Sequence, residues 1–392
     1  MSIPFSDRIR DVPRSFIREI LKDALQPGTI SFAGGLPNPD LFPVEALKQA
    51  SDRAYQEYGK QLLQYSESEG FLPLREWIAK RYQRYGLDID VSRIQITSGS
   101  QQGLDLLGKI FLNDGDGLVI EEPGYLGAIQ ALSLYKPNFC PVTVTDAGMD
   151  CEGLESILRS KPVKLIYTVP NFQNPSGITY PNDNRQDIAN IVKQHNCLLI
   201  EDNPYGELRF DGEHQTSFAN LLPDQTILLG SFSKTIVPGF RLGWIVVPTD
   251  LTEKVIIAKQ AADLHTNQLV QCSVYQYLLH NDIDQHIEKI ISVYRQQKDA
   301  MIAAMQEYFP QHADFTKPDG GMFLWADLPN NQSAVEVFHA AAKEKVIFVP
   351  GDPFYINRRN TNTMRLNFTC VDVETIQAGI QRLGKILHDQ HA

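Results

Sequence analysis

The sequence predicts an α/β protein with a mostly parallel sheet, followed by a smaller α+β lobe. Between about residues 93 and 247, short apolar runs rich in β-branched residues alternate with turns and helical segments, which is typical of strands buried in a parallel sheet. Polar residues follow the ends of several of these runs. Beyond about residue 250 the pattern changes to long helical spans and then to a mixed segment of strands and helices.

The overall composition is that of a large globular protein. The 392 residues are 43% hydrophobic and 21% charged, so the chain can bury a core large enough for two domains or for one domain with a lobe. A net charge of −11 disfavours nucleic acid as a partner. Five widely spaced cysteines without a CxxC pair favour reduced thiols and a cytoplasmic location. No apolar stretch is long enough to span a bilayer, and no metal site is predicted.

The N-terminal part predicts a helix over 14–25 and then a loop of fixed shape over 30–43. This loop contains Gly34, Gly35 and three prolines, which disfavour both helix and strand. It is either a packed surface loop or a segment whose adjacent glycines let the backbone approach a ligand. Helices are expected over 44–60 and 74–85.

The first strand of the repeating pattern, 93–97, leads through Ser98–Gly103 into a helix over 104–112. Small residues before a helix N-terminus leave backbone N–H groups free to bind an anion. A plain strand–helix connection looks similar. The segment is not a Walker A loop and lacks the three-glycine dinucleotide fingerprint.

Three further strands, at 118–120, 164–169 and 197–200, each lead to a polar side chain. Tyr125 follows the first, either as packing or as a stacking platform, and Asn174 follows the second in a proline-rich turn. Asp202 follows the third, where a carboxylate is costly unless a cation meets it.

The segment around Lys234 carries the strongest chemical signal. A strand over 226–230 ends in Ser231, Ser233 and Lys234, and a turn leads to a second strand over 242–247. A lysine at the end of a buried strand can lose water and have its pKa lowered, which is the condition for a Schiff-base lysine. The hydroxyls and the nearby Arg241 could hold a phosphate. The alternative is a solvated or salt-bridged lysine.

These candidates share one position in the fold. The carboxyl ends of parallel strands lie along one edge of a sheet, where ligands bind. We therefore expect a single site at that edge formed by residues distant in sequence: Ser100, Tyr125, Asn174, Asp202, Tyr205, Lys234 and Arg241.

The C-terminal part predicts long helices over 251–280 and 284–308, the second bridging the two parts. Strands are expected at 313–316, 322–326, 346–349 and 363–368, and helices at 333–344 and 372–388. Arg365 lies in a strand that otherwise reads as buried. It either pairs with an internal carboxylate or faces the site and binds a carboxylate of a ligand.

An imine-forming lysine, a buried carboxylate, an anion site at a helix N-terminus and a stackable aromatic fit a flat aromatic aldehyde with a phosphate. Pyridoxal 5′-phosphate is such a group, and proteins hold it by a lysine Schiff base and an acidic partner for its ring nitrogen. The alternative is a structural α/β protein with an ordinary polar edge.

The sequence resembles the fold-type I pyridoxal-phosphate aminotransferases of class I and II. It looks most like the group of 2-aminoadipate and kynurenine aminotransferases, whose module also occurs in MocR-type regulators. The motifs that carry the resemblance are Ser31–Pro37, Leu63–Ser66, Asn174–Gly177, Glu201–Tyr205 and Ser231–Lys234. The family fold implies a mostly parallel seven-stranded sheet sandwiched by helices, plus a smaller α+β domain. The implied divisions are an N-terminal arm and helix (1–50), a large domain (51–284) and a small domain (285–392).

The resemblance also implies roles for single residues. Lys234 forms the imine with the cofactor and shuttles a proton, assisted by Asp202 at the pyridine nitrogen and by Tyr205. Asn174 and Tyr205 bind the ring oxygen, and Tyr125 stacks on the ring. The phosphate is bound by Ser100, Gln101, Ser231, Ser233 and Arg241.

Further roles concern the substrate and a second subunit. Tyr65 reaches the phosphate of the neighbouring subunit, which implies a homodimer with sites at the interface. Arg365 holds the substrate α-carboxylate with the help of the Gly35 backbone and Asn174. Arg18 matches the arginine that reads a distal carboxylate in aminoadipate-preferring members, or it is a solvated surface charge.

The implied activity is transfer of an amino group from an L-amino acid to a 2-oxo acid such as 2-oxoglutarate, by a ping-pong reaction through Lys234. The donor would be 2-aminoadipate or an aromatic, branched or aliphatic amino acid. A β-lyase or decarboxylase on the same scaffold is one alternative. A non-catalytic module that senses amino acids is another, although residues 1–30 are too few for a winged helix-turn-helix. No nucleic-acid or membrane partner is expected.

Overall fold

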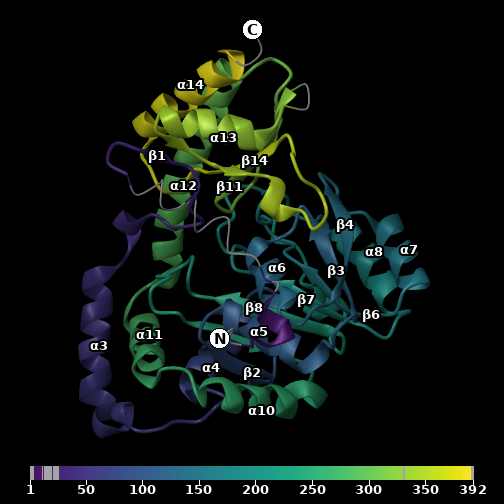
Figure 1. Cartoon of the computed structure of the whole chain (residues 1–392). Coiled ribbons are helices and arrows are strands. Elements are labelled where there is room, and N and C mark those ends of the chain that lie inside the picture. Colours follow the sequence, from purple (N-terminus) through teal and green to yellow (C-terminus); the bar gives the residue numbers. More distant parts are fainter. Residues whose placement is uncertain (1–3, 11, 13–19, 21–25, 330–331, 390–392) are drawn as a thin grey trace.

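The computed structural model describes residues 4–10, 12, 20, 26–329 and 332–389. The helix expected over 14–25, including Arg18, lies outside these residues apart from Ile20 and therefore stays a prediction. The described part consists of one large sheet with helices on both faces and a smaller group of strands and helices from the C-terminal part of the chain (Figure 1).

The large sheet confirms the predicted α/β class, with one correction. It has eight strands in the order β2-β9-β8-β7-β6-β3-β4-β5, not seven. The eighth is the two-residue β5, which pairs antiparallel to the end of β4. The strands are β2 (Ile94–Thr97), β3 (Gly117–Glu122), β4 (Asn138–Thr145), β5 (Gly148–Met149), β6 (Val163–Thr168), β7 (Leu198–Asp202), β8 (Thr226–Ser231) and β9 (Gly243–Val246).

The centre of this sheet is parallel and buried on both faces. Strands β4, β3, β6, β7 and β8 run parallel to one another, whereas β9 and β5 run the other way. Along β3, Leu118 and Ile120 belong to one hydrophobic core and Val119 to another. Successive side chains of a strand point to opposite faces, so apolar residues on both faces produce the continuous apolar runs seen in the sequence.

Helices cover the two faces. α5 (Ser100–Phe111) and α6 (Leu126–Ser133) pack on one face, and α7 (Cys151–Ser160) and α8 (Asn182–Val192) pack on the other. The remaining helices around this sheet are α1 (Asp7–Arg10), α3 (Val44–Tyr58), α4 (Leu72–Gln83), α9 (Phe218–Leu221), α10 (Thr252–Asp263) and α11 (Gln268–His280). Short 3-10 turns lie at Pro39–Leu41, Gly59–Leu63, Val91–Arg93, Thr249–Leu251 and Asp352–Phe354.

The single helix predicted over 251–280 is wrong, because the chain breaks between α10 and α11. Leu264 takes a left-handed backbone conformation with φ +65°, which ends a right-handed helix. Asn267 then caps α11, its side chain accepting a hydrogen bond from the backbone N–H of Val270 at 3.1 Å. Asparagine is a favoured N-cap residue.

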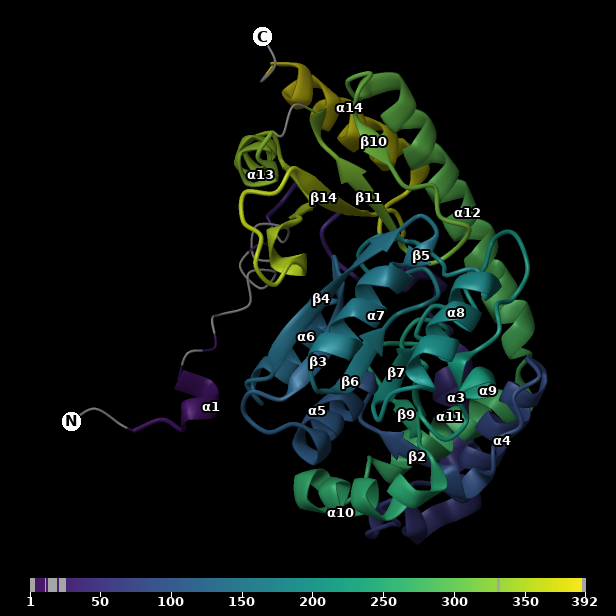
Figure 2. The ribbon, with the colours of Figure 1, turned by 90° about the vertical axis from the view of Figure 1, so that its right-hand side faces the viewer.

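The C-terminal part forms a second sheet in the order β10-β11-β14-β13. Its strands are β10 (Asp314–Phe315), β11 (Phe323–Asp327), β13 (Val349–Pro350) and β14 (Thr363–Asn367), and its helices are α13 (Ala334–Lys343) and α14 (Val373–Asp389). The two-residue strand β1 (Ile30–Ser31) pairs in parallel with β12 (Val346–Ile347), so the N-terminal segment joins this part. The long helix α12 (Ile283–Tyr308) runs beside both parts (Figure 2).

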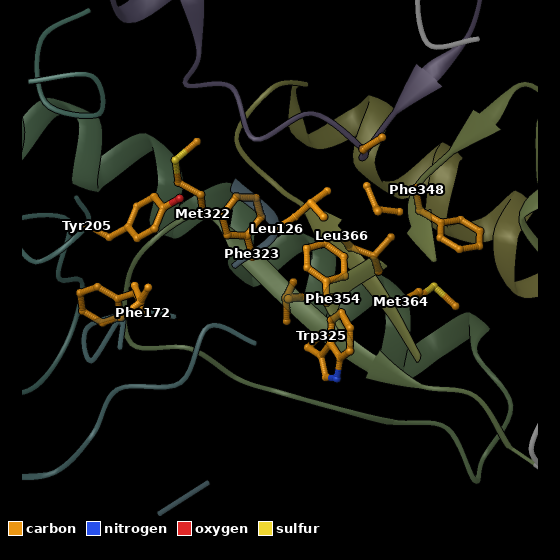
Figure 3. Close-up of a cluster of buried hydrophobic side chains, with 14 of the residues drawn as sticks. Leu126, Phe172, Tyr205, Met322, Phe323, Trp325, Phe348, Phe354, Met364 and Leu366 are labelled. Carbon is orange, nitrogen blue, oxygen red and sulfur yellow. The ribbon is translucent and has the colours of Figure 1, made fainter. Parts of the chain in front are cut away.

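A hydrophobic cluster joins the second sheet to segments that follow individual strands of the large sheet. Phe323 of β11 and Tyr205, which follows β7, meet edge to face with ring centroids 5.9 Å apart. Figure 3 shows these two rings beside Phe172 and the side chains of β11 and β14. This packing holds the second sheet over the carboxyl ends of the central strands.

None of the described helices is long and apolar enough to cross a membrane. In the same part of the chain, no three or more His, Cys, Asp and Glu side chains gather so that they could hold a metal ion.

Leu229→Ala should destabilise the protein strongly, because Leu229 of β8 is fully buried against α5. A Cβ atom added to Gly103 of α5 would lie only 3.0 Å from Leu229 Cδ2, so the helix and the strand are in close contact there. Removing this side chain leaves a cavity, and the expected loss in the free energy of unfolding is about 2–5 kcal/mol. Urea unfolding followed by circular dichroism measures it.

The matched control is Ile257→Ala, which removes an apolar side chain that is 50% exposed on α10. We expect this change to alter the free energy of unfolding by no more than about 0.5 kcal/mol. Equal losses in the two variants would contradict the tight packing of α5 on β8.

Candidate active site

A cavity of about 440 Å³ lies where the central strands of the large sheet end. It brings together residues from both sheets and from the N-terminal loop. Twelve of the fourteen predicted site residues line it: Gly35, Ser100, Gln101, Tyr125, Asn174, Asp202, Tyr205, Ser231, Ser233, Lys234, Arg241 and Arg365. The expected convergence on one edge of the sheet is therefore present in the structure.

Asp202, the last residue of β7, is a buried carboxylate with one oxygen free. Its Oδ2 accepts a hydrogen bond from the hydroxyl of Tyr167 at 2.8 Å, whereas Oδ1 has no partner among the described residues. Burial raises the pKa of Asp202 to about 7, Glu121 adds to the rise, and the Tyr167 bond opposes it. A buried acceptor without a donor is costly, and a protonated pyridine nitrogen supplies both a donor and a charge at this position.

Lys234 lies just beyond β8 and faces the cavity. Its Nζ donates a hydrogen bond to the backbone oxygen of Gly35 at 2.7 Å, and no carboxylate of the described residues lies within ion-pair distance of it. Burial lowers the pKa of Lys234 to about 8, and the positive charge of Arg365 adds to this effect. A substantial fraction of the amine is therefore neutral near physiological pH, as a nucleophilic lysine requires.

Three kinds of anion-binding group meet at the N-terminus of α5. The helix begins after Gly99 with no side-chain cap, so its first backbone N–H groups are available to a ligand. The hydroxyl of Ser231 lies 2.8 Å from that of Ser233. The guanidinium of Arg241 packs so closely on Gly99 that a Cβ atom there would lie 2.6 Å from Nη2. Helix N–H groups, hydroxyls and a guanidinium are the kinds of group that bind phosphate.

Arg365 of β14 is a buried cation without a carboxylate partner in the described part of the chain. Its Nη1 donates to Asn174 Oδ1 at 2.8 Å and its Nη2 to the Ala33 oxygen at 2.7 Å, and Nε has no partner among the described residues. The guanidinium lies 4.4 Å from the ring centroid of Phe323. Burial lowers the pKa of Arg365 to about 10, so the group remains charged at neutral pH. Of the two alternatives left by the sequence, the side chain faces the site.

Asn174, Tyr205, Tyr125 and Gln101 also line the cavity. Asn174 Nδ2 lies 3.4 Å from the hydroxyl of Tyr205, so both can reach the same ligand atom. Tyr125 precedes α6, and burial raises its pKa to about 12. The side-chain nitrogen of Gln101 donates to the Gly127 oxygen at 2.9 Å.

Sequence reasoning missed Tyr167, the partner of Asp202. Tyr167 is fully buried within β6 and is one apolar-looking residue among several, so nothing in the sequence separates it from the core. The register of the parallel pair β6–β7 places it beside Ile200, two residues before Asp202 and therefore on the same face.

Of the other two predicted site residues, Tyr65 does not line the cavity. The side chain of Tyr65 is 79% exposed, and its ring meets that of His265 edge to face at 6.0 Å. Arg18 lies outside the described residues.

Comparison with known proteins gives a consistent picture. The family model for aminotransferases of class I and II matches residues 32–383. The aromatic-amino-acid aminotransferase 1 of Thermococcus litoralis is 41% identical over 98% of this chain and 94% of its own length. The 2-aminoadipate transaminase of Thermus thermophilus is 40% identical over 96% and 94%.

A solved structure agrees closely with the fold. The kynurenine aminotransferase of Pyrococcus horikoshii, solved in complex with PMP, superposes with a TM-score of 0.94 at 40% identity and covers 99% of this chain and 98% of its own. The free Asp202 oxygen, the partly neutral lysine and the anion site fit the pyridoxal cofactor of such enzymes. The chain belongs to the class I and II aminotransferases of fold type I, and it is a pyridoxal-phosphate-dependent enzyme that transfers amino groups.

Proposed function

We propose that this enzyme transfers the amino group of an L-amino acid to a 2-oxo acid such as 2-oxoglutarate. The proposed donors are 2-aminoadipate and amino acids with aromatic, branched or aliphatic side chains. Relatives at about 40% identity that are named for aromatic amino acids, 2-aminoadipate and kynurenine support this range. The observation that carries the proposal is the pair Lys234 and Arg365, which places an amine of lowered pKa and a charged guanidinium in one cavity.

The cofactor would be held by residues on three sides of the cavity. When bound, pyridoxal phosphate supplies an aldehyde that carries the amino group and a ring that accepts electrons. Asp202 would keep the ring nitrogen protonated through its free oxygen, Asn174 and Tyr205 would bind the ring oxygen, and Tyr125 would lie against the ring. The proposed phosphate ligands are Ser100, Gln101, Ser231, Ser233 and Arg241.

Lys234 would move the proton at the substrate Cα. Its lowered pKa of about 8 suits it both to take up and to release a proton near neutral pH, because acid–base catalysis is most effective when the pKa lies near the working pH.

Arg365 would bind the substrate α-carboxylate. A planar guanidinium binds a carboxylate through two parallel hydrogen bonds. The guanidinium of Arg365 is held in place by its hydrogen bonds to Asn174 and to the Ala33 carbonyl. Asn174 and the Gly35 backbone would complete this subsite. Arg18 would bind a distal carboxylate, which is a proposal from sequence alone.

We also propose that the enzyme is a homodimer. Tyr65 stands outside the cavity of its own chain, and Leu63 beside it is 76% exposed. Exposed large apolar side chains close together mark interaction surfaces, and Tyr65 would act in the neighbouring subunit's phosphate site. The proposed divisions are an arm of residues 1–50, a large domain of 51–284 and a small domain of 285–392. The five cysteines are free thiols, which supports a cytoplasmic location that cell fractionation would test.

The central test is an amino-transfer assay with 2-oxoglutarate and a panel of acidic, aromatic, branched and small amino acids, in which glutamate formation is measured. We expect transfer from at least one proposed donor class. Lys234→Ala should lower the rate for every donor by about 100- to 10,000-fold, because the group that moves the Cα proton is lost.

Arg365→Lys is the informative second variant, since it keeps the charge but loses the two-pronged geometry. It should mainly raise KM. Release of pyruvate and ammonia without an acceptor, together with no glutamate from any donor, would contradict amino transfer and favour a lyase. An unchanged rate in Lys234→Ala would contradict the assignment of the lysine.

The ionisation of Lys234 can be measured without cofactor. Only a neutral amine reacts with acetic anhydride, so acetylation of Lys234 in the cofactor-free protein should rise with pH and reach half its maximum near pH 8. Exposed lysines should reach theirs near about pH 10.4. Competitive labelling read by mass spectrometry separates the sites. A midpoint for Lys234 near that of the exposed lysines would show that burial does not lower its pKa.

Sedimentation equilibrium tests the proposed dimer. The chain mass is 44.2 kDa, and the holoenzyme should sediment as twice that mass. Tyr65→Asp, which places a charge in the proposed contact, should shift the protein toward the single-chain mass because an unpaired buried charge is costly. A wild-type protein of single-chain mass at micromolar concentration would rule out the shared site.

A further inference from the structure

A second cavity, of about 360 Å³, lies beside the cofactor cavity. The two cavities receive consecutive residues of β7, because Asp202 lines the first and Glu201 the second. Along the same strand, Leu199 and Ile200 belong to cores on opposite faces. Glu201 therefore points away from Asp202, toward the other face of the sheet. Pro204 and Ser231 line both cavities.

Glu201 is a buried carboxylate with one unused oxygen. The residue is fully buried, and its Oε2 accepts hydrogen bonds from the Ser217 hydroxyl at 2.6 Å and the Phe218 N–H at 2.8 Å. Oε1 has no partner within the described residues. Buried polar atoms are nearly always hydrogen-bonded, so an unused carboxylate oxygen in a cavity indicates that a ligand donor belongs there.

Within the described residues, no basic side chain near the cavity forms an ion pair with Glu201. Arg81 lies 2.6 Å from Glu207 and 2.7 Å from Asp284, so its charge is already balanced. Burial lowers the pKa of His214 below its usual value, which keeps this imidazole uncharged at neutral pH. Burial raises the pKa of Glu201 above its usual value, and the nearby charge of Arg185 opposes this rise.

Arg185 does not, however, bond to Glu201. All of its hydrogen bonds go to backbone oxygens and to the side chain of Asn171. No cation among the described residues makes direct contact with the carboxylate.

The walls of the cavity are aromatic. Five aromatic side chains line it: Trp77, Tyr82, Tyr85, Phe232 and Trp244. The ring centroids of Phe232 and Trp244 lie 4.8 Å apart. Thr216, in the segment before α9, lines the cavity and is exposed, whereas Glu201 lines it and is fully buried. Aromatic walls with a single polar anchor are typical of small-molecule sites.

We propose that this cavity is a second ligand site, separate from the cofactor site, for a small molecule with a planar aromatic body and a cationic hydrogen-bond donor. The donor binds Glu201 Oε1, and the ring packs between the aromatic walls. An aromatic cation fits both features, because aromatic faces also attract positive charge.

Benzamidine is a suitable probe, since its amidinium is a planar cationic donor that is a poor nucleophile toward the cofactor aldehyde. Calorimetric titration of the holoenzyme should show one benzamidine bound per chain, with no loss of cofactor absorbance. Glu201→Gln should weaken the affinity by about 30-fold or more, because a buried charge pair is removed. Benzoate, of opposite charge, should not bind at this site.

The matched control is Glu253→Gln, the same chemical change at an exposed position in the first turn of α10, which should leave the affinity unchanged. Glu201→Gln could lose the cofactor or unfold at a lower temperature than the wild type. In that case Glu201→Asp is the second variant: it keeps a carboxylate but moves it farther from the cavity, and it should also weaken benzamidine binding. A crystal of the holoenzyme soaked in benzamidine should show the amidinium on Glu201. Ordered water alone in the cavity, no calorimetric binding at millimolar benzamidine, or equal affinity in wild type and Glu201→Gln would overturn the proposal.

Discussion

The site depends on burying ionisable groups that have no counter-ion of their own. Asp202, Lys234 and Arg365 all line one cavity. Burial raises the pKa of Asp202 and lowers the pKa of Lys234 and Arg365, which in each case favours the neutral form. Such an arrangement is costly in a free protein, so the packing of the rest of the fold must offset it. The central strands are covered on both faces by packed helices, and Asp202 and Lys234 lie at or just beyond the ends of two of these strands.

The second sheet contributes one wall of the cavity. Arg365 comes from β14, and its guanidinium bonds both to Asn174, which follows β6, and to Ala33 of the N-terminal loop. Three distant segments thus meet at one cation. The edge-to-face contact of Phe323 and Tyr205 fixes the same approach from the apolar side. The contacts that form this side of the site are therefore also contacts that pack the two parts of the molecule together.

Sequence patterns predict those structural features that are determined by residues close together in the chain. Lys234 and Asp202 could be found because buried strands produce apolar runs and the residue after such a run lies at the edge of the sheet. Tyr167 could not be found, since only the register between β6 and β7 makes it a partner of Asp202. The break at Leu264 was missed because a leucine gives no sign of a left-handed conformation. The two-residue β5 is too short to leave a pattern. Tyr65 lies outside the cavity of its own chain, and no local sequence pattern indicates that position.

The hydrogen bonds of the N-terminal loop have a consequence for how the site fills. The carbonyls of Ala33 and Gly35 accept hydrogen bonds from Arg365 and Lys234, the two cations proposed to bind substrate and cofactor. Each ligand that engages one of these cations competes with the loop for the same donor. The same loop is also held by bonds that involve neither cation, since Thr369 and Cys370 donate to the Leu36 oxygen and the Tyr294 hydroxyl accepts from the Asn38 N–H. These bonds keep the loop attached to the rest of the protein when the two cations turn to a ligand.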